Sequence, residues 1–283
     1  MIGYCVPVVP AMASYRLRVA IPMRNLGCPA RIGRGNPTFF FKHHAGDVDT
    51  LEQCLLDGAS VVYDVVNDHF GGQLGDHYRR MCDLATAVTA GSETMAARVK
   101  ACTGIGATVI DDPYETPESP VGAGSGVLWF GHGANLPSLL RVADDLVDAD
   151  LTVCTNVRKD GFVPWSQESE ARCLAACLVV LVTGDNPGAS SNRIVKALRA
   201  GKFVVTNGGV PAWEQFRPFV WIGGVAAGLR WLEANREEAW NKVRMGQEYV
   251  RTKFSPWTIG QQWRTLFDSI SGPETSASRA GCE

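Results

Sequence analysis

The sequence predicts an α/β protein made of two Rossmann-like domains that face one another across a cleft. Strand-like and helix-like segments alternate along both halves of the 283 residues. Several strand-like segments, such as residues 178–183, are apolar throughout, which is typical of parallel strands covered by helices on both faces. A stretch rich in proline, glycine and serine at residues 116–126 separates the halves and has the composition of a linker.

Periodicity and end signals define the elements of the first half. Gly27 and Gly58 stand where helices would end, and Ser92 stands where one would begin. The expected elements are a strand at 2–10, a helix at 14–27, a strand at 38–44, a helix at 48–58, a strand at 59–66, a segment at 77–88 that leads into a short strand, a helix at 92–104 and a strand at 107–112.

The same alternation restarts in the second half. The expected elements are a strand at 127–130, a helix at 135–149, a strand at 151–156, a helix at 166–177, a strand at 178–184, a helix at 191–201, a strand at 202–208 and three closing helices that end near residue 270. Residues 272–283 have the composition of a flexible tail.

Charge and cysteine content restrict the class of protein. The net charge is −2, but the first 46 residues contain six basic residues and no acidic one. This asymmetry fits either an anionic partner or a chance cluster of solvated arginines, and both interpretations stay open. The nine cysteines show no C-x-x-C spacing, which favours reduced thiols and a cytoplasmic location. No apolar run is long enough for a membrane span.

Residues 184–208 form the most distinctive stretch, in which a polar loop enters a short helix and a β-branched strand follows. A helix N-terminus has unpaired backbone N–H groups and partial positive charge. The loop adds donors at the same place, namely Ser190, Ser191, Asn192 and Arg193. This combination predicts a diphosphate site, with simple capping of the helix as the alternative.

Three other polar loops follow predicted strands, where open α/β sheets bind their ligands. The loop at 131–138 has Leu136 where a dinucleotide fingerprint needs its third glycine, which argues against a nicotinamide-dependent oxidoreductase. Trp165 is either a core residue or one wall of a nucleobase slot. Asp68 beside His69 is either part of a general base or a cap of the next helix.

The second half resembles the donor-binding half of GT-B glycosyltransferases. The resemblance lies in residues 127–140, 163–166, 178–216 and 255–263, and in residues 1–115 it rests on topology and on the positions at 63–70 and 109–115. It implies an acceptor-side domain at 1–115, a linker at 116–126, a nucleotide-sugar-binding domain at 127–255 and a helix at 256–271 that crosses back to the first domain.

The resemblance also implies an activity, the metal-independent transfer of a hexose from a nucleotide diphosphate sugar, with UDP favoured, to an acceptor hydroxyl. No cofactor is expected besides this co-substrate. The diphosphate would meet the loop donors at 190–193. The sugar or phosphate side would be lined by Gly131, His132, Gly133 and Asn135. The nucleobase would lie beside Val163, Pro164 and Trp165. The base would be Asp68 or His69.

The acid-free N-terminal segment belongs to the implied acceptor side. Its candidate acceptor-binding residues are Arg16, Arg18, Lys42 and His43. They favour an anionic acceptor such as hydroxymethylated DNA, a phosphorylated lipid headgroup or an acidic glycan.

One departure from the family pattern concerns a pair of glutamates that retaining members carry. Gly188 and Lys196 stand at those positions. Their absence leaves retention or inversion open. It also supports the alternative of a non-catalytic module that binds a nucleotide or a glycan.

Overall fold

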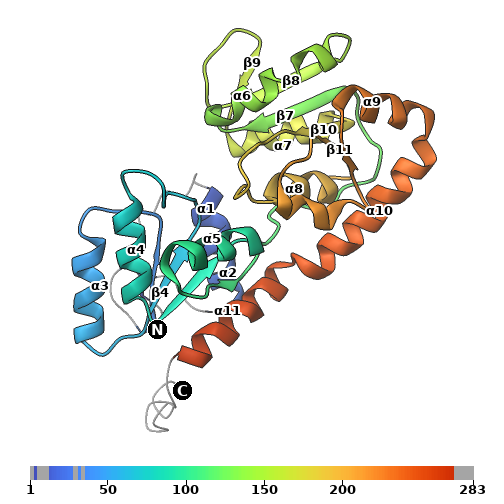
Figure 1. The fold of residues 1–283 in the computed structure, drawn as a ribbon. Helices are drawn as coiled ribbons and strands as arrows, with labels where there is room; N and C mark the ends of the chain where they lie inside the picture. The colour runs from blue at the N-terminus through green and yellow to red at the C-terminus, as the bar shows by residue number, and fades with distance from the viewer. Residues whose placement is uncertain (1–2, 5–12, 28–30, 33–35, 271–283) are drawn as a thin grey trace. The chain divides into compact units, whose positions relative to one another are not determined.

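A computed structural model of the chain describes residues 3–4, 13–27, 31–32 and 36–270 (Figure 1). The chain divides into two compact units, residues 1–111 with 256–283 and residues 112–255. The expected tail at 272–283 and most of the expected strand at 2–10 lie outside the described residues.

The first unit is a parallel sheet with helices on both faces. Within the described residues its strand order is β2-β1-β3-β4-β5-β6, so the order reverses between β1 and β3. The strands are β1 (Gly3–Tyr4), β2 (Arg31–Ile32), β3 (Thr38–Phe41), β4 (Val61–Val65), β5 (Ala87–Ala90) and β6 (Thr108–Val109). The helices are α1 (Ala13–Tyr15), the π-helical turn η1 (Arg16–Ala20), α2 (Ile21–Asn25), α3 (Asp47–Leu56), α4 (Gly75–Leu84), α5 (Glu93–Thr103) and α11 (Pro256–Ile270).

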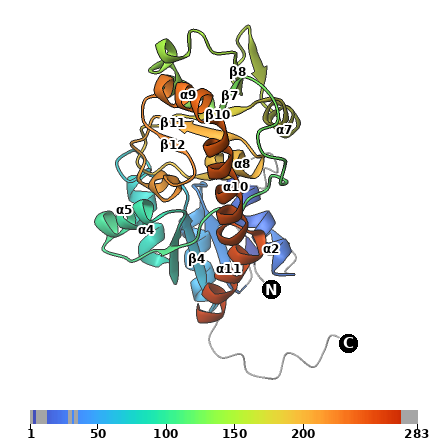
Figure 2. The ribbon, with the colours of Figure 1, turned by 90° about the vertical axis from the view of Figure 1, so that its right-hand side faces the viewer.

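Alternate side chains of the central strands enter two separate hydrophobic layers, as the two-residue period of a strand requires. Phe40 and Tyr63 pack with side chains of α3, α4 and α5. Phe39, Phe41 and Val62 pack with side chains of α2 and α11. Figure 2 shows α11 beside α2, which it contacts.

A buried ion pair lies in the α2 and α11 layer. Arg18 donates from Nε and Nη2 to the two carboxylate oxygens of Asp64, at 2.8 and 2.6 Å, and Thr89 Oγ1 donates to Asp64 Oδ1 at 2.7 Å. The Arg18 guanidinium also lies over the ring of Trp263, 5.2 Å from its centroid. The Arg18 and Asp64 side chains are 2% and 0% exposed.

This geometry corrects the prediction that Arg18 binds the acceptor. A charged side chain is buried at this depth when it is paired, and the partner of Arg18 is supplied by β4, 46 residues further along the chain. The Arg18 guanidinium therefore stabilises the first unit and is not available to an acceptor in solution.

The second unit has the strand order of a dinucleotide-type Rossmann fold. Within the described residues the order is β12-β11-β10-β7-β8-β9, all pairs parallel, and it reverses between β7 and β10. The strands are β7 (Val127–Gly131), β8 (Leu151–Thr155), β9 (Phe162–Pro164), β10 (Val179–Val182), β11 (Phe203–Thr206) and β12 (Trp221–Ile222).

Helices cover both faces of this sheet as well. They are η2 (Gly133–Asn135), α6 (Leu136–Leu140), η3 (Ala143–Leu146), α7 (Gln167–Ala176), α8 (Asn192–Arg199), η4 (Pro211–Phe216), α9 (Val225–Ala234) and α10 (Arg236–Lys253). The single helix expected at 135–149 is thus interrupted: α6 ends at Leu140 and the 3-10 turn η3 follows at 143–146.

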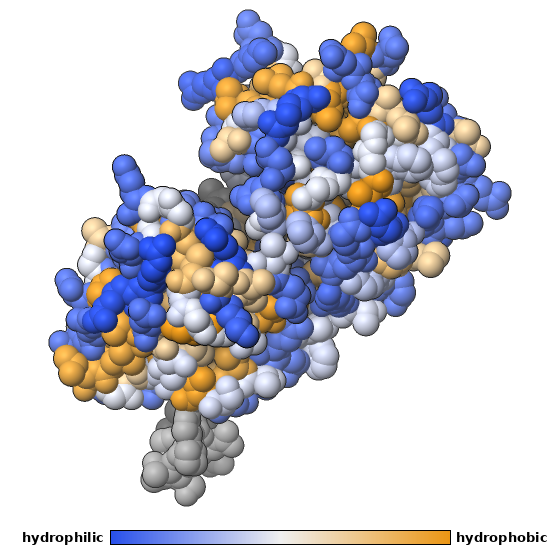
Figure 3. All heavy atoms as spheres, in the orientation of Figure 1, coloured by the Kyte–Doolittle hydropathy of each residue, from blue (hydrophilic) through white to orange (hydrophobic). Residues whose placement is uncertain are grey.

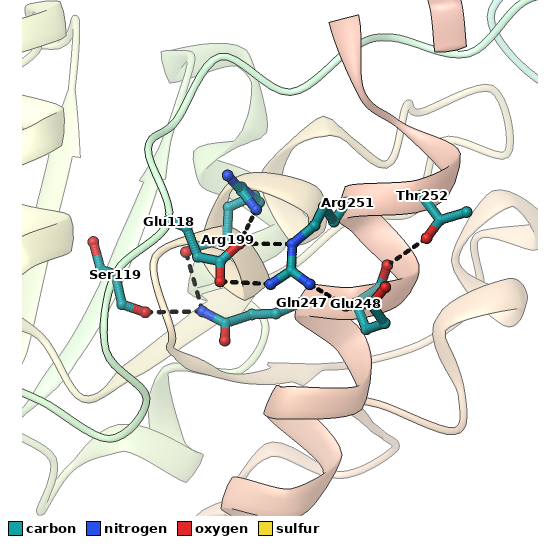
Figure 4. A network of polar contacts seen from close by, with 7 residues as sticks. All are labelled: Glu118, Ser119, Arg199, Gln247, Glu248, Arg251 and Thr252. Atoms are coloured by element: carbon teal, nitrogen blue, oxygen red, sulfur yellow. Dashed lines mark hydrogen bonds and ion pairs between the residues drawn. The ribbon is translucent and has the colours of Figure 1, made fainter. Parts of the chain in front are cut away.

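The segment expected as a linker, residues 116–126, packs on the second unit. The N–H of Ser119 donates to the Arg199 carbonyl, and the N–H of Gly122 donates to the Gly201 carbonyl, each at 3.0 Å. Glu118 forms ion pairs with Arg199 and Arg251 (Figure 4). A Cβ at Gly201 would lie 2.3 Å from the Pro120 carbonyl oxygen, so this close approach requires glycine there.

The hydropathy of the surface, the length of the helices and the state of the cysteines bear on the expectations from the sequence. Figure 3 shows hydrophilic residues over most of the visible face, with hydrophobic residues in small scattered groups. Among the helices that the structure describes, none has the length and the apolarity that a membrane span requires. The six described cysteines are free thiols, and the other three lie outside the described residues.

Removing the carboxylate of Asp64 should destabilise the first unit strongly. In the variant Asp64→Asn the buried Arg18 charge loses its counterion, which we expect to cost about 3–5 kcal/mol of unfolding free energy. Urea denaturation followed by circular dichroism measures the change. Glu52→Gln is the matched control, because the Glu52–Arg80 pair is exposed and should contribute about 1 kcal/mol or less. Equal losses in the two variants would contradict the structural role of Arg18.

Candidate functional site

The crevice where ligands bind in such a sheet lies outside the carboxyl ends of β7 and β10, where the strand order reverses. The loop at 132–135 follows β7, and the loop at 183–191 follows β10 and leads into α8. Both loops predicted to contact a donor therefore lie at this one edge of the second unit.

Thr183, the first residue after β10, joins three elements at this edge. Its hydroxyl accepts a hydrogen bond from Trp129 Nε1 at 2.8 Å and lies 2.8 Å from Ser138 Oγ. Its carbonyl accepts from Arg193 Nη2 at 2.8 Å. Thr183 and Trp129 are fully buried, so this junction ties the ends of β7 and β10 to α6 and α8 beneath the surface.

The guanidinium of Arg193 bridges the carboxyl ends of β7 and β10. Besides the Thr183 carbonyl it reaches the Phe130 carbonyl, at 3.5 Å. No carboxylate of the described residues lies within ion-pair distance of it, and burial lowers the pKa of Arg193 to about 10. Arg193 still carries its charge at neutral pH, and no acidic side chain of the described residues balances that charge.

The N-terminus of α8 offers further donors. Its N-cap residue, Ser191, makes no capping hydrogen bond. Within the described part of the chain, the Ser191 hydroxyl and the Asn192 amide have no hydrogen-bond partner. Ser190 is more committed, since its hydroxyl accepts from the Asn192 N–H at 3.4 Å and its carbonyl accepts from Trp213 Nε1 at 3.3 Å. The geometry thus leaves Ser191, Asn192 and Arg193 with donors to give.

The loop after β7 is held by Asn156, which the sequence did not indicate. Asn156 Oδ1 accepts from the Gly133 N–H at 2.7 Å, and its Nδ2 lies 3.2 Å from His132 Nε2. His132 Nδ1 accepts from the Ala134 N–H at 3.2 Å. The imidazole of His132 therefore stabilises the loop, whereas the exposed Asn135 side chain has no hydrogen-bond partner among the described residues.

A glycine in this loop is required by close packing. A Cβ at Gly133 would lie 2.3 Å from a methyl carbon of Val157, and one at Gly131 would lie 3.4 Å from Arg193 Nη1. The backbone at Gly131 and Gly133 can approach Arg193 and the next loop for this reason.

The predicted nucleobase segment, residues 163–165, consists of the end of β9 and the residue that follows it. Trp165 is half-buried against the core of the second unit, its indole Nε1 donates to Glu170 Oε2 at 2.7 Å, and its backbone N–H donates to the Thr155 carbonyl at 2.8 Å. The Pro164 carbonyl accepts from Ser169 Oγ at 2.7 Å. Hydrogen bonding within the unit thus fixes the segment, and Val163 packs partly on the same core.

Lys196, which stands where the family pattern has a glutamate, is a buried residue of α8. Its Nζ lies 2.7 Å from Glu115 Oε1 and 2.5 Å from Glu170 Oε1. Two carboxylates therefore neutralise it. No sequence pattern indicates this cluster, because its members come from three separate segments of the chain.

In the first unit, Asp68 and His69 follow β4. Asp68 Oδ1 accepts from the Phe70 N–H at 3.1 Å, and its Oδ2 accepts from Arg98 Nε at 2.9 Å. One oxygen of Asp68 thus holds the local turn and the other pairs with Arg98 of α5, whereas the next helix, α4, begins at Gly75 without a side-chain cap, so Asp68 is not its cap. His69 is exposed, its ring packs edge-on against Tyr78 at 5.3 Å, and its nitrogens have no hydrogen-bond partner among the described residues.

The remaining acceptor candidates lie near the carboxyl end of β3 or in η1. His43 is exposed and its ring lies 4.4 Å from that of His77 on α4. Lys42 is half-buried with φ of 62°, and burial lowers its pKa. Arg16 is half-buried in η1. Among the described residues no group of histidine, cysteine or acidic side chains could hold a metal ion.

A separate cavity of about 550 Å³ lies at the opposite edge of the second unit, beside the amino ends of β7, β8 and β10. Its charged lining includes Asp144, Asp148, Asp150, Arg230, Glu233 and Arg236. None of the predicted site residues lines it, and open α/β sheets bind their ligands at the other edge.

Solved structures with a similar fold include three that match along nearly the whole chain. HepE of Anabaena, crystallised with UDP and glucose and with UDP-glucose, has TM-scores of 0.72 and 0.71, each at 13% identity over 95% of this chain and 99% of that chain. A glycosyltransferase of Rickettsia africae has 0.63 at 9% over 95% and 98%. AviGT4, a glycosyltransferase involved in avilamycin A biosynthesis, has 0.56 at 18% over 95% and 97%.

These similarities confirm the predicted fold class. The chain has the fold of GT-B glycosyltransferases, with two Rossmann-like units. No protein-family model and no curated protein sequence matches it.

Thr183→Val should destabilise the second unit while preserving side-chain shape. The buried indole N–H of Trp129 then loses its acceptor, which we expect to cost about 1–3 kcal/mol. The midpoint of urea unfolding reports the loss. Thr183→Ser keeps the hydroxyl and should retain most of the stability. A valine variant as stable as the serine variant would show that the junction at Thr183 is unimportant.

Proposed function

We propose that the protein transfers a sugar from a UDP-sugar to an acceptor hydroxyl, and that the donor diphosphate binds at the switch point of the second unit. The observation that carries this proposal is Arg193, a charged side chain without a carboxylate partner among the described residues, placed beside an uncapped helix N-terminus. HepE, which shares the fold, was crystallised with UDP-glucose.

The donor side of the reaction follows from these charges. As the bond between the anomeric carbon and the diphosphate oxygen breaks, the leaving UDP gains negative charge. Arg193 and the first N–H groups of α8 would stabilise that charge, with Ser191 and Asn192 as further donors. Because these groups supply positive charge, we expect transfer without an added divalent cation.

The acceptor side needs a base, and we propose His69 in preference to Asp68. Both oxygens of Asp68 already hold the turn and Arg98, whereas the imidazole of the exposed His69 can receive a proton. His69 takes the proton of the acceptor hydroxyl, whose oxygen forms the new bond to the anomeric carbon as UDP leaves with the electron pair of the old one. Such a direct displacement inverts the anomeric centre.

The acceptor would meet Arg16, Lys42 and His43, since Arg18 is occupied by Asp64. These residues favour an acceptor with negative charge near its hydroxyl, and hydroxymethylated DNA is one such acceptor. Steep loss of binding with added salt is expected for a nucleic acid. Binding unaffected by salt would exclude this class.

A non-catalytic module that binds a UDP-sugar is the second candidate, favoured by Lys196 at a glutamate position. Turnover of the donor distinguishes a transferase from a non-catalytic module. A thermal-shift series with nucleotide sugars first identifies the donor, because a ligand of the folded state raises the melting temperature with its concentration. Release of free UDP from that donor then shows catalysis, and binding without release would favour the module.

Arg193→Met should reduce donor turnover about 10²–10³-fold, because the leaving group loses its main source of positive charge. The fold should persist, since Thr183 keeps its other contacts. Initial rates of UDP release measure the effect, and Arg217→Met, which alters an exposed ion pair of the same unit, is the control. Full activity in the Arg193 variant would exclude it from the donor site.

His69→Gln should lower the rate of transfer about 10²–10⁴-fold and leave UDP affinity unchanged, because it removes the base without touching the donor unit. Asp68→Asn is the comparison and should keep most of the rate. The assignment is reversed if the Asp68 variant is the inactive one. Transfer rate and UDP affinity, measured separately, distinguish the cases.

A further inference from the structure

We infer that Glu170 is a positioning residue that ties Trp165, on the proposed nucleobase side, to helix α8, on the proposed diphosphate side. The inference rests on the proposed function and adds how the two parts of the nucleotide are recognised together. Glu170 lies in the first half of α7 and is 8% exposed, so its contacts are sheltered from water.

The two oxygens of Glu170 serve different elements. Oε2 accepts from the indole Nε1 of Trp165 at 2.7 Å, and Oε1 lies 2.5 Å from Lys196 Nζ. Lys196 follows Arg193 by three residues on α8, so the two lie within one helical turn. One carboxylate thus links the ring after β9 to the helix that carries Arg193.

This link determines what Trp165 can offer a ligand. Its indole N–H is committed to Glu170 and its backbone N–H to the Thr155 carbonyl, so neither can read the edge of a base. The face of the half-buried ring remains, and aromatic faces bind nucleobases by stacking. Stacking depends on ring orientation, which the hydrogen bond to Glu170 sets.

Neutralisation of Lys196 does not by itself account for Glu170. Glu115 already lies 2.7 Å from Lys196 Nζ and would balance its charge alone. The second carboxylate is placed where it also meets the indole N–H. A matched comparison follows, because Glu115 and Glu170 share Lys196 but only Glu170 is hydrogen-bonded to Trp165 by its side chain.

Calorimetric titration with UDP and with inorganic pyrophosphate tests the inference. In Glu170→Leu, UDP affinity should fall about tenfold while pyrophosphate affinity changes less than about threefold. Glu115→Leu should leave both affinities near those of the unchanged protein. Glu170→Gln keeps an acceptor for the indole and should recover most of the UDP affinity.

The indole contributes a second, independent readout. Trp165→Phe keeps a ring but removes the donor, and it should weaken UDP binding. The double variant Trp165→Phe/Glu170→Leu should bind UDP no more weakly than Glu170→Leu alone, because both changes break one hydrogen bond. If Glu170→Leu does not fold, Trp165→Phe alone provides the test, because it should weaken UDP binding and change pyrophosphate affinity less than about threefold. Equal losses for the two ligands would then overturn the role of Glu170.

The outcomes separate this inference from the proposed function. Two results would overturn the role of Glu170 and leave the donor assignment standing. In the first, Glu170→Leu binds UDP as tightly as the unchanged protein does. In the second, Glu170→Leu loses affinity for UDP and for pyrophosphate by the same factor. Additive losses in the double variant overturn it too. If the unchanged protein binds pyrophosphate but not UDP, the UDP assignment fails and the inference fails with it.

Discussion

The bridge that Arg193 makes between the Phe130 and Thr183 carbonyls is the contact on which the candidate donor site depends. It joins the ends of β7 and β10 at the place where the strand order reverses, and it anchors the first turn of α8 there. The same contact keeps a positive charge at this edge of the sheet without a carboxylate from the described residues. A charge held in this way is costly for the free protein, and a bound anion lowers that cost.

Three buried or half-buried basic side chains differ in whether an acidic side chain lies next to them. Arg18 is matched by Asp64 and acts as a structural element of the first unit. Lys196 forms ion pairs with Glu115 and Glu170, and these pairs connect α8 to the segments that carry the two glutamates. Arg193 has only carbonyl partners among the described residues. The acidic partners of Arg18 and Lys196 distinguish these two side chains from Arg193, which lies at the carboxyl ends of β7 and β10.

Hydrogen bonding also divides the predicted site residues into two groups. His132, Pro164 and Asp68 are held by contacts within their own units and shape the loops. Ser191, Asn192 and Asn135 keep donors without partners in the described residues and are the side chains free to meet a ligand. Residues of both groups lie in loops at strand ends. The sequence therefore predicted which loops matter, but it could not predict which of their side chains are already hydrogen-bonded.

The sequence by itself determined the α/β class and the parallel strands, and it predicted the edge of the sheet at which a ligand would bind. These features follow from the period of apolar residues and from loops such as 184–191, where the signal lies within a few neighbouring positions. Only the tertiary structure decided which charges are paired. Asp64 lies 46 residues from Arg18, and Glu170 lies 26 residues from Lys196. The energy of a charged group depends on what lies within a few ångströms of it, and the folded chain alone sets those distances.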